Sequence, residues 1–178
     1  MRFVRLREEH LEKVLRWRTS ERVTRFMFTD VAYDMDKQRE WFRSVAAGAH
    51  SRYWVIVSGE TEIGLVSLTR MHPVHRSAHW AYYIGEPEFG TAAVIVGPCL
   101  YRYAFGRLGL NKLIGEVMEE NAAVRRIHLM HGAREVGVYR EHIWKNGKFH
   151  NVVVYEMLAD DWRRAEPRFA KYEGSFEE

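Results

Sequence analysis

The chain has 178 residues, of which 47% are hydrophobic and 13% aromatic, and this predicts a single domain with one substantial core. Lys and Arg outnumber Asp and Glu by 27 to 24, a mild basicity that suits a phosphorylated ligand and equally suits an ordinary solvated surface. The single Cys99 excludes an intrachain disulfide, and neither a signal sequence nor an uncharged stretch of roughly 20 residues is present, so we expect a cytoplasmic protein outside the membrane.

The first segment combines an expected edge strand at 3–6 with a helix over 8–18. Leu11, Val14 and Leu15 form one apolar stripe on this helix, which predicts a side that faces the core. A cluster of arginines accompanies the stripe and is compatible with a solvated face, a phosphate clamp or a nucleic-acid surface. No aromatic-interleaved groove or nucleic-acid-binding motif accompanies these charges, so we expect no nucleic-acid partner. The cluster comprises Arg16, Arg18, Arg22 and Arg25.

A second helix is expected after Asp34 or Asp36, since either carboxylate can cap a helix N-terminus. Gln38 lies on the apolar face of this helix by its spacing from the other members of that face. A polar side chain in such a place needs a hydrogen-bond partner, which is either a ligand in the neighbouring cleft or a backbone carbonyl. The apolar members of the face are Trp41, Phe42 and Val45.

Three strands are expected in the middle of the chain. The segments 53–58 and 62–69 alternate in polarity about a glycine-containing turn, which predicts a β-hairpin. The third strand, 79–84, is rich in aromatic residues and ends at Gly85.

A turn containing Gly90 and Thr91 follows the third strand and leads into a helical pattern that reaches Gly109. A helix that begins after a strand presents unpaired backbone N–H groups and a dipole that together favour a phosphate. The turn is therefore either a pyrophosphate cradle or an ordinary connection.

A short buried strand at 112–117 precedes Asn121, which opens another helix. Glu116 lies near the end of this strand, where strand ends open into a cleft in an α/β domain. This carboxylate is our best candidate to orient or deprotonate an amine, and its alternative role is that of a solvent-facing strand residue.

The last third of the chain predicts a second hairpin, with strands 136–144 and 149–158 joined through Asn146 and Gly147. Asn-Gly supplies the two positive φ angles of a type I′ turn. Beyond Trp162 the segment 163–178 is charged and weakly patterned, and we expect a frayed helix or a dimer arm.

Nine histidines raise the question of a metal site, notably His72, His75 and His79. The chain has no second cysteine and no carboxylate pair at metal-ligand spacing near them. We therefore expect loop histidines and no metal.

The order of these elements resembles the GNAT superfamily of acyl-CoA-dependent N-acyltransferases over nearly the whole chain. Three pieces carry the resemblance: the strand, turn and helix of 79–108, the run "YAFGRLGLNKLIGEVMEENAAVRRIHLMHG" of 103–132, and "VLRWRTSERVTRFMFTD" of 14–30 with "QREWF" after it. Within the superfamily, the front segment, the hairpin "YWVIVSGETEIGLVSL" and the ending "GVYREHIWKNGKFHNVVVYEMLADDW" resemble the N-acetyltransferases of the pseudaminic acid pathway of flagellin glycosylation.

The resemblance implies an α/β (α+β) GNAT fold with a mixed, mostly antiparallel sheet of six to seven strands in one domain at 1–162. It implies transfer of acetyl from acetyl-CoA to the amino group of a UDP-linked 4-amino-4,6-dideoxy sugar, by direct attack and without a covalent enzyme intermediate. Ribosomal-protein N-terminal and polyamine acetyltransferases share the same pieces less closely. The superfamily commonly dimerises through strands or their edges, so a homodimer is compatible with the sequence.

Site residues follow from the same resemblance. In the family, a Tyr about seven residues after the helix-opening Asn protonates the CoA sulfur, and His128 stands there in this chain. A histidine of ordinary pKa can donate that proton, Glu116 can take one from the amine through water, and Ser67 can relay it. Alternatively, His128 is a packed helix residue and the thiolate leaves unaided.

The resemblance also implies the residues that bind the two substrates. The implied acetyl-CoA residues are Tyr83, Ile84, Gly90, Thr91, Ala92, Ala93, Asn121 and Arg125. The implied acceptor residues are Arg18, Met27, Gln38, Thr69, Arg70 and Tyr83.

Two features depart from the family pattern at the cofactor turn. Glu88 stands where a basic or amide residue is expected, and Thr91 replaces a glycine. Gly97-Pro98 falls within the following helix, where a proline costs about 3 kcal/mol, so the helix either kinks or begins at Pro98. Ala133 also replaces an aromatic residue after Gly132. A GNAT-fold binding or regulatory module with a degenerate CoA site is therefore the alternative from another functional class.

Overall fold

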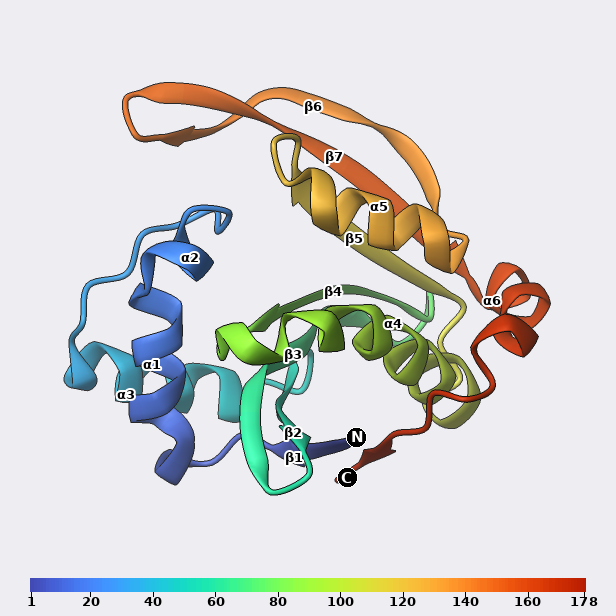
Figure 1. The fold of residues 1–178 in the computed structure, drawn as a ribbon, viewed down its shortest axis with the longest axis horizontal. Coiled ribbons are helices and arrows are strands. Elements are labelled where there is room, and N and C mark those ends of the chain that lie inside the picture. The colour runs from blue at the N-terminus through green and yellow to red at the C-terminus, as the bar shows by residue number, and fades with distance from the viewer.

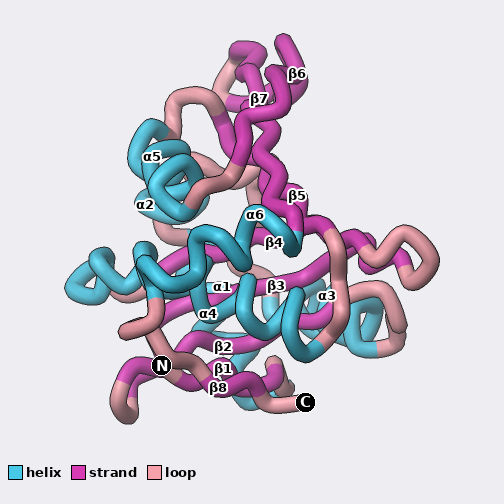
Figure 2. The backbone as a smooth tube through the Cα atoms, turned by 90° about the vertical axis from the view of Figure 1, so that its right-hand side faces the viewer, coloured by secondary structure: helices cyan, strands magenta, loops and turns pink.

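The computed structural model describes residues 1–178 as one mixed eight-stranded sheet with helices on both faces. The strand order is β6-β7-β5-β4-β3-β2-β1-β8, and only the β4–β5 and β1–β8 pairs are parallel (Figure 1). Figure 2 shows the strands rising from β8 and β1 to β6 and β7. The strands are β1 (Arg2–Arg5), β2 (Arg52–Ser58), β3 (Thr61–His72), β4 (Ser77–Ile84), β5 (Lys112–Met118), β6 (Arg134–Lys145), β7 (Lys148–Leu158) and β8 (Ser175–Phe176).

A helix is present at each of the four places where the sequence predicts one, and the structure adds further short helices. Asp34, rather than Asp36, caps α3, because its side chain accepts hydrogen bonds from two backbone N–H groups of the first turn. The helices are η1 (Glu8–His10), α1 (Leu11–Thr19), α2 (Glu21–Thr24), α3 (Met35–Ala46), η2 (Pro87–Ala92), α4 (Ala93–Tyr101), the π-helical η3 (Arg102–Arg107), α5 (Ala122–His131), α6 (Ala159–Ala165) and η4 (Glu166–Phe169). None of them is long and apolar enough to span a bilayer.

The two central parallel strands pair over only three residues. Ser77 to His79 of β4 lie opposite Lys112 to Ile114 of β5, and beyond this point the two strands diverge (Figure 1). Unpaired strand segments on both sides leave an opening in the middle of the sheet. This opening is where the functional site must be sought.

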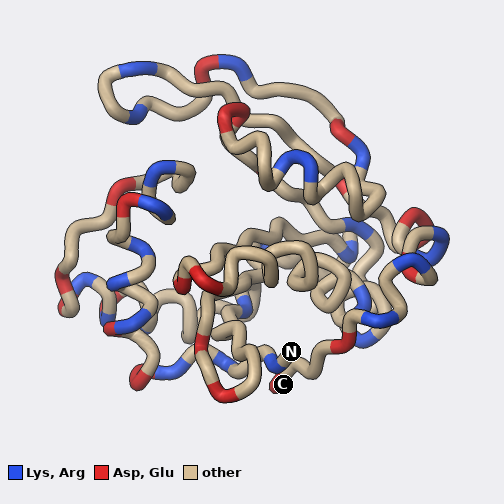
Figure 3. The backbone as a smooth tube through the Cα atoms, in the orientation of Figure 1, with Lys and Arg blue, Asp and Glu red and all other residues tan.

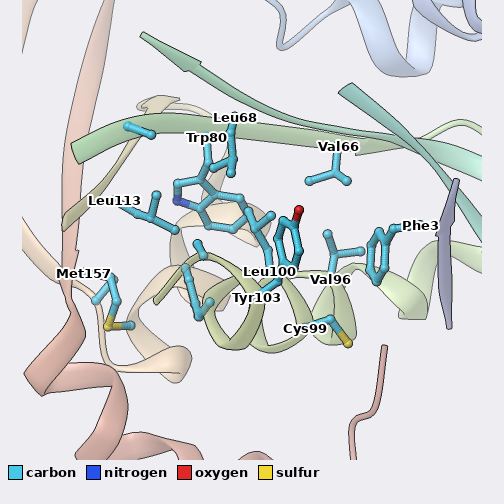
Figure 4. Close-up of a cluster of buried hydrophobic side chains, with 14 of the residues drawn as sticks. Phe3, Val66, Leu68, Trp80, Val96, Cys99, Leu100, Tyr103, Leu113 and Met157 are labelled. Atoms are coloured by element: carbon cyan, nitrogen blue, oxygen red, sulfur yellow. The ribbon is translucent and has the colours of Figure 1, made fainter. Parts of the chain in front are cut away.

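Two apolar clusters hold the helices to the sheet. The larger has 26 residues and packs α4 and the C-terminal segment on one face, where Trp80, Leu100 and Leu113 meet (Figure 4). The smaller has seven residues and packs α1 on the other face, with Leu11 and Val14 among them as the apolar stripe predicts. The opening in the sheet therefore lies between two well-packed halves.

Both predicted hairpins are present. The β6–β7 turn has φ of 52° at Asn146 and 74° at Gly147, the left-handed values of a type I′ turn. The β2–β3 turn has its left-handed residue at Gly59, with φ of 60°. These local signals fix the pairing of each hairpin independently of the rest of the fold.

The C-terminal segment corrects the expected boundary at 162. Instead of a frayed helix or a dimer arm, 163–178 continues α6, forms η4 and ends in β8, which pairs parallel with β1. The sheet therefore has eight strands, and β1 is not the edge. Phe176 explains this docking, since its ring stacks on Phe3 and Tyr103 at centroid distances of 4.0 and 4.2 Å.

The proline of α4 neither starts nor breaks the helix, which begins at Ala93 and runs through Pro98. Pro98 has no N–H to donate to the carbonyl oxygen of Val94, four residues earlier. The imidazole Nε2 of His131, on α5, donates to that oxygen at 2.9 Å instead. Gly97 makes room for this contact, because a Cβ there would lie 2.6 Å from the His131 ring.

Candidate functional site

The opening between β4 and β5 is a cavity of about 720 Å³. Its walls are the divergent ends of the two strands, the start of α5, the start of α4, and the segment of α1, α2 and the loop after them. A volume of this order is typical of a site for a cofactor or a large small-molecule ligand.

A second cavity of about 320 Å³ adjoins the first, between the sheet and the helices α1 and α3. Most of its lining side chains are apolar, and its polar exceptions are few. Arg18, Met27, Ser67 and Tyr83 line both cavities, so a ligand that occupies one lies against the other.

Most of the predicted cofactor residues come together. Tyr83, Ile84, Gly90, Ala93 and Asn121 all line the larger cavity. Asn121 caps α5 by accepting a hydrogen bond from the backbone N–H of the residue three positions later, at 3.4 Å.

Three other predicted cofactor residues do not line either cavity. Thr91 is exposed on η2, and Ala92 is buried in the larger core cluster. Arg125 is held on α5 by donating to the Tyr155 hydroxyl at 3.1 Å and to the carbonyl oxygen of Glu119 at 3.2 Å. Its guanidinium is thus engaged within the protein.

The backbone of the turn fits a phosphate-bearing group. A Cβ at Gly90 would meet nothing within 4 Å, so the face of the turn toward the cavity is open. η2 begins at Pro87, directly after the end of β4, and runs on into α4, where the Ala93 N–H already donates to the carbonyl oxygens of Gly90 and Thr91. The substitution of Thr91 for glycine leaves this open face in place, because its side chain lies outside the cavity lining.

Five of the six predicted acceptor residues line one or both cavities: Arg18, Met27, Gln38, Thr69 and Tyr83. The sixth, Arg70, lies in the bulge between β3 and β4 with φ of 49° and lines neither cavity. The Gln38 amide reaches the carbonyl oxygen of Leu11 at 3.5 Å, so the backbone partner foreseen for it exists although its side chain also borders the smaller cavity.

Arg18 is a cation without an acidic partner. Its Nη2 donates to the backbone oxygen and hydroxyl of Thr29 at 2.7 and 2.9 Å, and it makes no ion pair. Burial is the main cause that lowers the pKa of Arg18, opposed by the nearby Asp30 carboxylate. That carboxylate is bound by Lys145 instead. A half-buried guanidinium in this state is prepared for an anionic ligand.

Two tyrosine hydroxyls are buried beside the cavities. Neither the Tyr82 nor the Tyr83 hydroxyl has a hydrogen-bond partner within the protein. Burial raises the pKa of both groups, so each stays protonated and can donate.

Glu116 meets His79, a histidine to which the sequence assigned no role in the site. The imidazole Nδ1 of His79 lies 3.8 Å from Glu116 Oε2, and both side chains are about four-fifths buried. Burial, ahead of the opposing effect of Glu116, lowers the pKa of His79, which is therefore neutral at pH 7 and able to accept a proton. A correct alignment of β4 with β5 would have revealed this pair. His79 is paired with Ile114 in the parallel register, and Glu116 lies two residues further along the same face of β5.

Ser67 lies on β3, two residues from Thr69, and on the same side of the sheet as His79, the β4 partner of Thr69. Its Cα is paired with that of Ala81 on β4, and its hydroxyl reaches the Ala81 carbonyl oxygen at 3.5 Å. This weak hydrogen bond leaves the hydroxyl available to a ligand that enters from either cavity.

The structure corrects the pKa assumed for His128. Its ring is only 4% exposed, stacks on Tyr155 at a centroid distance of 4.8 Å and lies 5.2 Å from Trp80. Gly115 allows this close packing, since a Cβ there would lie 2.6 Å from the ring. Burial, followed by the charge of His131, lowers the pKa of His128 to about 3. An imidazolium is therefore not available at neutral pH, although the ring still borders the larger cavity.

The segment of α1 and α2 is tied to the cofactor turn by contacts that the sequence did not reveal. Arg22 Nη2 donates to the carbonyl oxygens of Ile84 and Gly85 at 2.7 and 2.6 Å. Trp17 Nε1 donates to Glu86 Oε1 at 2.9 Å, and its ring lies where a side chain on Gly85 would be. These contacts join the α1–α2 segment to the end of β4 and to the turn that follows it.

The β6–β7 hairpin reaches across the cleft. Its Lys145 ammonium is almost fully buried and forms an ion pair with Asp30 of the loop after α2. The ring nitrogens Nε2 and Nδ1 of His150, on β7, lie 3.1 Å from the carbonyl oxygen of Lys145 and 2.8 Å from a carboxylate oxygen of Glu120. In Figure 3, basic and acidic positions are interspersed along this hairpin and along the α1–α2 segment that faces it.

Known proteins resemble this chain in sequence and in fold. The family profile described as "Acetyltransferase (GNAT) domain" matches residues 1–134. The Bacillus subtilis proteins named "Putative ribosomal N-acetyltransferase YdaF" and "Uncharacterized N-acetyltransferase YoaA" are 32% and 28% identical over 56% and 59% of this chain. The chain spans only 55% and 61% of the lengths of these two relatives.

Among solved structures, the spermidine N-acetyltransferase from Vibrio cholerae in complex with CoA and spermine aligns with a TM-score of 0.84. The alignment covers 90% of this chain and 96% of that protein, at 22% sequence identity. At this identity the likeness establishes the fold, and with the family profile it agrees with the fold predicted from the sequence.

Proposed function

The chain belongs to the GNAT family of acetyltransferases, and we propose that it transfers an acetyl group from acetyl-CoA to the amino group of a nucleotide-linked 4-amino-4,6-dideoxy sugar. The observation that carries this proposal is the charge of the smaller cavity, whose lining includes the cationic side chains of Arg18 and Lys37 and no carboxylate. An acceptor that fits must carry negative charge in addition to its amine, as a UDP-linked sugar does. Arg22, Arg25 and Glu116 border only the larger cavity.

The larger cavity is assigned to the acetyl donor. The end of β4 at Tyr83 and Ile84, the open face of Gly90, and the cap of α5 at Asn121 all border it. Acetyl-CoA supplies an acetyl thioester, whose carbonyl an amine nitrogen attacks directly while the sulfur leaves as a thiolate. The protein's part is then to hold the amine, remove its proton and keep water out.

Glu116 and His79 are assigned to the amine proton. Glu116 borders the cavity and accepts the proton through water, and the neutral imidazole of His79, 3.8 Å away, carries it toward solvent. The hydroxyl of Ser67 borders both cavities and bridges an amine in the smaller one to this pair. The lowered pKa of His79 keeps the ring neutral at pH 7, so it is free to take the proton and releases it readily to solvent.

His128 acts in this proposal as a neutral imidazole. With a pKa of about 3 it carries one N–H, which can donate a hydrogen bond toward the leaving sulfur without a full proton transfer. Its packing between Trp80 and Tyr155 holds the ring at the wall of the cavity.

Arg18 is assigned to the anionic part of the acceptor. It borders both cavities, makes no ion pair, and lines the smaller cavity together with Trp41 and Tyr53, whose rings lie 5.2 Å apart. An arginine beside an aromatic wall suits a phosphate attached to a planar base. Met27 and Gln38 complete this wall.

Two rival acceptors use the same chemistry. A polyamine would bring several positive charges into a cleft already lined by arginines, which is unfavourable at close range. The N-terminus of a ribosomal protein is favoured by the name of the YdaF relative, which is 32% identical over 101 residues. A free protein N-terminus carries its charge on the reacting amine alone, so Arg18 would have no partner in it.

The test is a calorimetric titration with acetyl-CoA followed by acetyl transfer to a panel of amines. The panel comprises the UDP-linked 4-amino-4,6-dideoxy sugar, the same sugar without the nucleotide, spermidine, and a peptide with a free N-terminus. Arg18→Gln is compared with Arg16→Gln, a matched control on the exposed side of α1. We expect acetyl-CoA binding in the micromolar range, turnover of the UDP-linked sugar, and a rise in its KM of about tenfold or more in Arg18→Gln only.

The outcomes separate the alternatives. Preferential turnover of spermidine or of the peptide would refute the assignment of the acceptor and leave the acetyltransferase assignment intact. Failure of the wild-type protein to bind acetyl-CoA would refute the enzyme itself and favour a GNAT-fold binding or regulatory module.

We also propose a homodimer through the outer strand β6, which forms one edge of the sheet. Val138, Tyr139 and Trp144 are each more than 40% exposed on this strand, an unusual density of apolar side chains at a free edge. Light scattering after size-exclusion chromatography tests this, and Tyr139→Glu is expected to yield a monomer.

A further inference from the structure

We propose that Arg22 is the cationic residue for the pyrophosphate of acetyl-CoA, and that it supplies from α2 the positive charge that the cofactor turn itself lacks. This inference rests on the proposed use of acetyl-CoA. In the sequence, Arg22 is only one member of a cluster of arginines, and here it is assigned to the pyrophosphate.

The turn has no cation of its own. From Pro87 to Tyr101 the chain contains no Lys or Arg, and its charged residues near the cavity are Glu86 and Glu88. The Glu86 carboxylate accepts a hydrogen bond from Trp17, while Glu88 is exposed. Backbone N–H groups alone would have to balance two acids and a pyrophosphate, so a neighbouring cation is needed.

Arg22 is fixed at this corner. Its Nη2 donates to the carbonyl oxygens of Ile84 and Gly85, the last residue of β4 and the first after it. The packing of Trp17 against Gly85 holds α1, and with it α2, in the same place. The position of the guanidinium is thus defined by the backbone that leads into the turn.

The rest of the guanidinium is free to bind. Only Nη2 makes hydrogen bonds, so Nε and Nη1 keep donors available, and Arg22 makes no ion pair. The side chain borders the larger cavity together with Gly90 and Ala93, whose backbone forms the open face of the turn. Arg25 also borders this cavity, but its guanidinium lies over the ring of Phe26 at 4.6 Å and has no contact with the turn.

The experiment separates a charge contact from a merely structural role. CoA and pantetheine, which lacks the phosphates, are titrated into the wild-type protein, Arg22→Gln, Arg22→Lys and the control Arg16→Gln by calorimetry. S-acetyl-pantetheine is compared with acetyl-CoA as acetyl donor, so that a weak ligand is still measured. Thermal unfolding of each variant reports whether the fold is kept.

We expect Arg22→Gln to bind CoA about 10- to 100-fold more weakly, the effect of losing a charge-assisted hydrogen bond. In Arg22→Gln, the affinity for pantetheine and the kcat/KM for S-acetyl-pantetheine should be unchanged. The CoA affinity of Arg22→Lys should lie between those of the wild type and Arg22→Gln. Arg16→Gln should behave as the wild type.

The assignment is overturned if Arg22→Gln binds CoA as tightly as the wild type, or if it loses CoA and pantetheine equally, since that would mean that Arg22 only holds the turn. If the wild-type protein does not bind CoA, the proposed use of acetyl-CoA is wrong, and this outcome is distinct from a failure of the Arg22 assignment alone.

Discussion

Acidification should destabilise this protein through two buried histidines on α5. His128 and His131 are 4% and 0% exposed. Burial, ahead of the charge of His131, lowers the pKa of His128 to about 3. Burial also lowers the pKa of His131 to about 4, with its hydrogen bond to Val94 opposing this and the charge of Arg168 adding to it. Both rings are therefore neutral in the folded protein throughout the mildly acidic range.

The direction of the pH effect on stability depends on whether the folded or the unfolded chain binds more protons. An unfolded histidine has a pKa near 6.5, so between pH 6.5 and about 4 the unfolded chain takes up protons that the folded chain does not. The stabilisation is complete above pH 6.5 and declines as the pH falls. From pH 7.5 to 5.5 each histidine should lower the free energy of unfolding by about 1.4 kcal/mol, or about 2.7 kcal/mol together. For a chain of this size that corresponds to roughly 5 to 10 °C in the unfolding temperature.

The assay is urea denaturation followed by tryptophan fluorescence at pH 7.5 and 5.5, for the wild type, His128→Phe and His72→Gln. Phe keeps the aromatic packing of His128 and removes its proton site, so this variant should lose about half of the pH dependence. His72→Gln, on the exposed β3–β4 turn, should keep the wild-type difference. Equal stability of the wild type at the two pH values, or an undiminished difference in His128→Phe, would refute the reasoning.

Three further changes have definite expected outcomes. Gly97→Ala places a methyl 2.6 Å from the His131 ring and should lower the free energy of unfolding by roughly 1 to 3 kcal/mol in urea denaturation, whereas a wild-type value would show that the ring can move aside. Glu116→Gln should reduce kcat by about 100-fold or more with calorimetric CoA affinity unchanged, and full activity would remove this carboxylate from the mechanism. Lys145→Met removes the partner of Asp30 whose hydrogen bond chiefly lowers the pKa of that carboxyl group. In steady-state assays this variant should have a raised KM for the acceptor and an unchanged KM for acetyl-CoA.

The parts of the fold that were predictable are those specified by neighbouring residues. The positive φ angles of Asn146 and Gly147 define a hairpin without reference to the rest of the chain, and Asp34 caps α3 through residues two and three positions away. Five of the eight residues predicted for the cofactor line one cavity for a related reason. They belong to one strand, one turn and two helix starts that occur in order.

The features that were missed depend on partners distant in the sequence. Pro98 is tolerated inside α4 because a side chain 37 residues away replaces its missing hydrogen bond, and no local pattern reports that. The docking of β8 depends on the rings of Phe3 and Tyr103, which the charged composition of the tail conceals. The low pKa of His128 is a consequence of burial, which the spacing of a helix face suggests only when the packing partners are known.

The arrangement of α1 and α2 suggests how donor and acceptor recognition are combined in one short segment. Arg18 and Arg22 are four residues apart, and both border the larger cavity, yet their backbone partners differ. Arg18 is held by the loop that covers the acceptor side, whereas Arg22 is held by the end of β4 on the donor side. A change in this segment would therefore alter the selection of the acceptor and the affinity for the donor together. A conserved fold with a variable segment at this point can change its acceptor while keeping acetyl transfer, which is why the likeness to a spermidine acetyltransferase does not determine the substrate here.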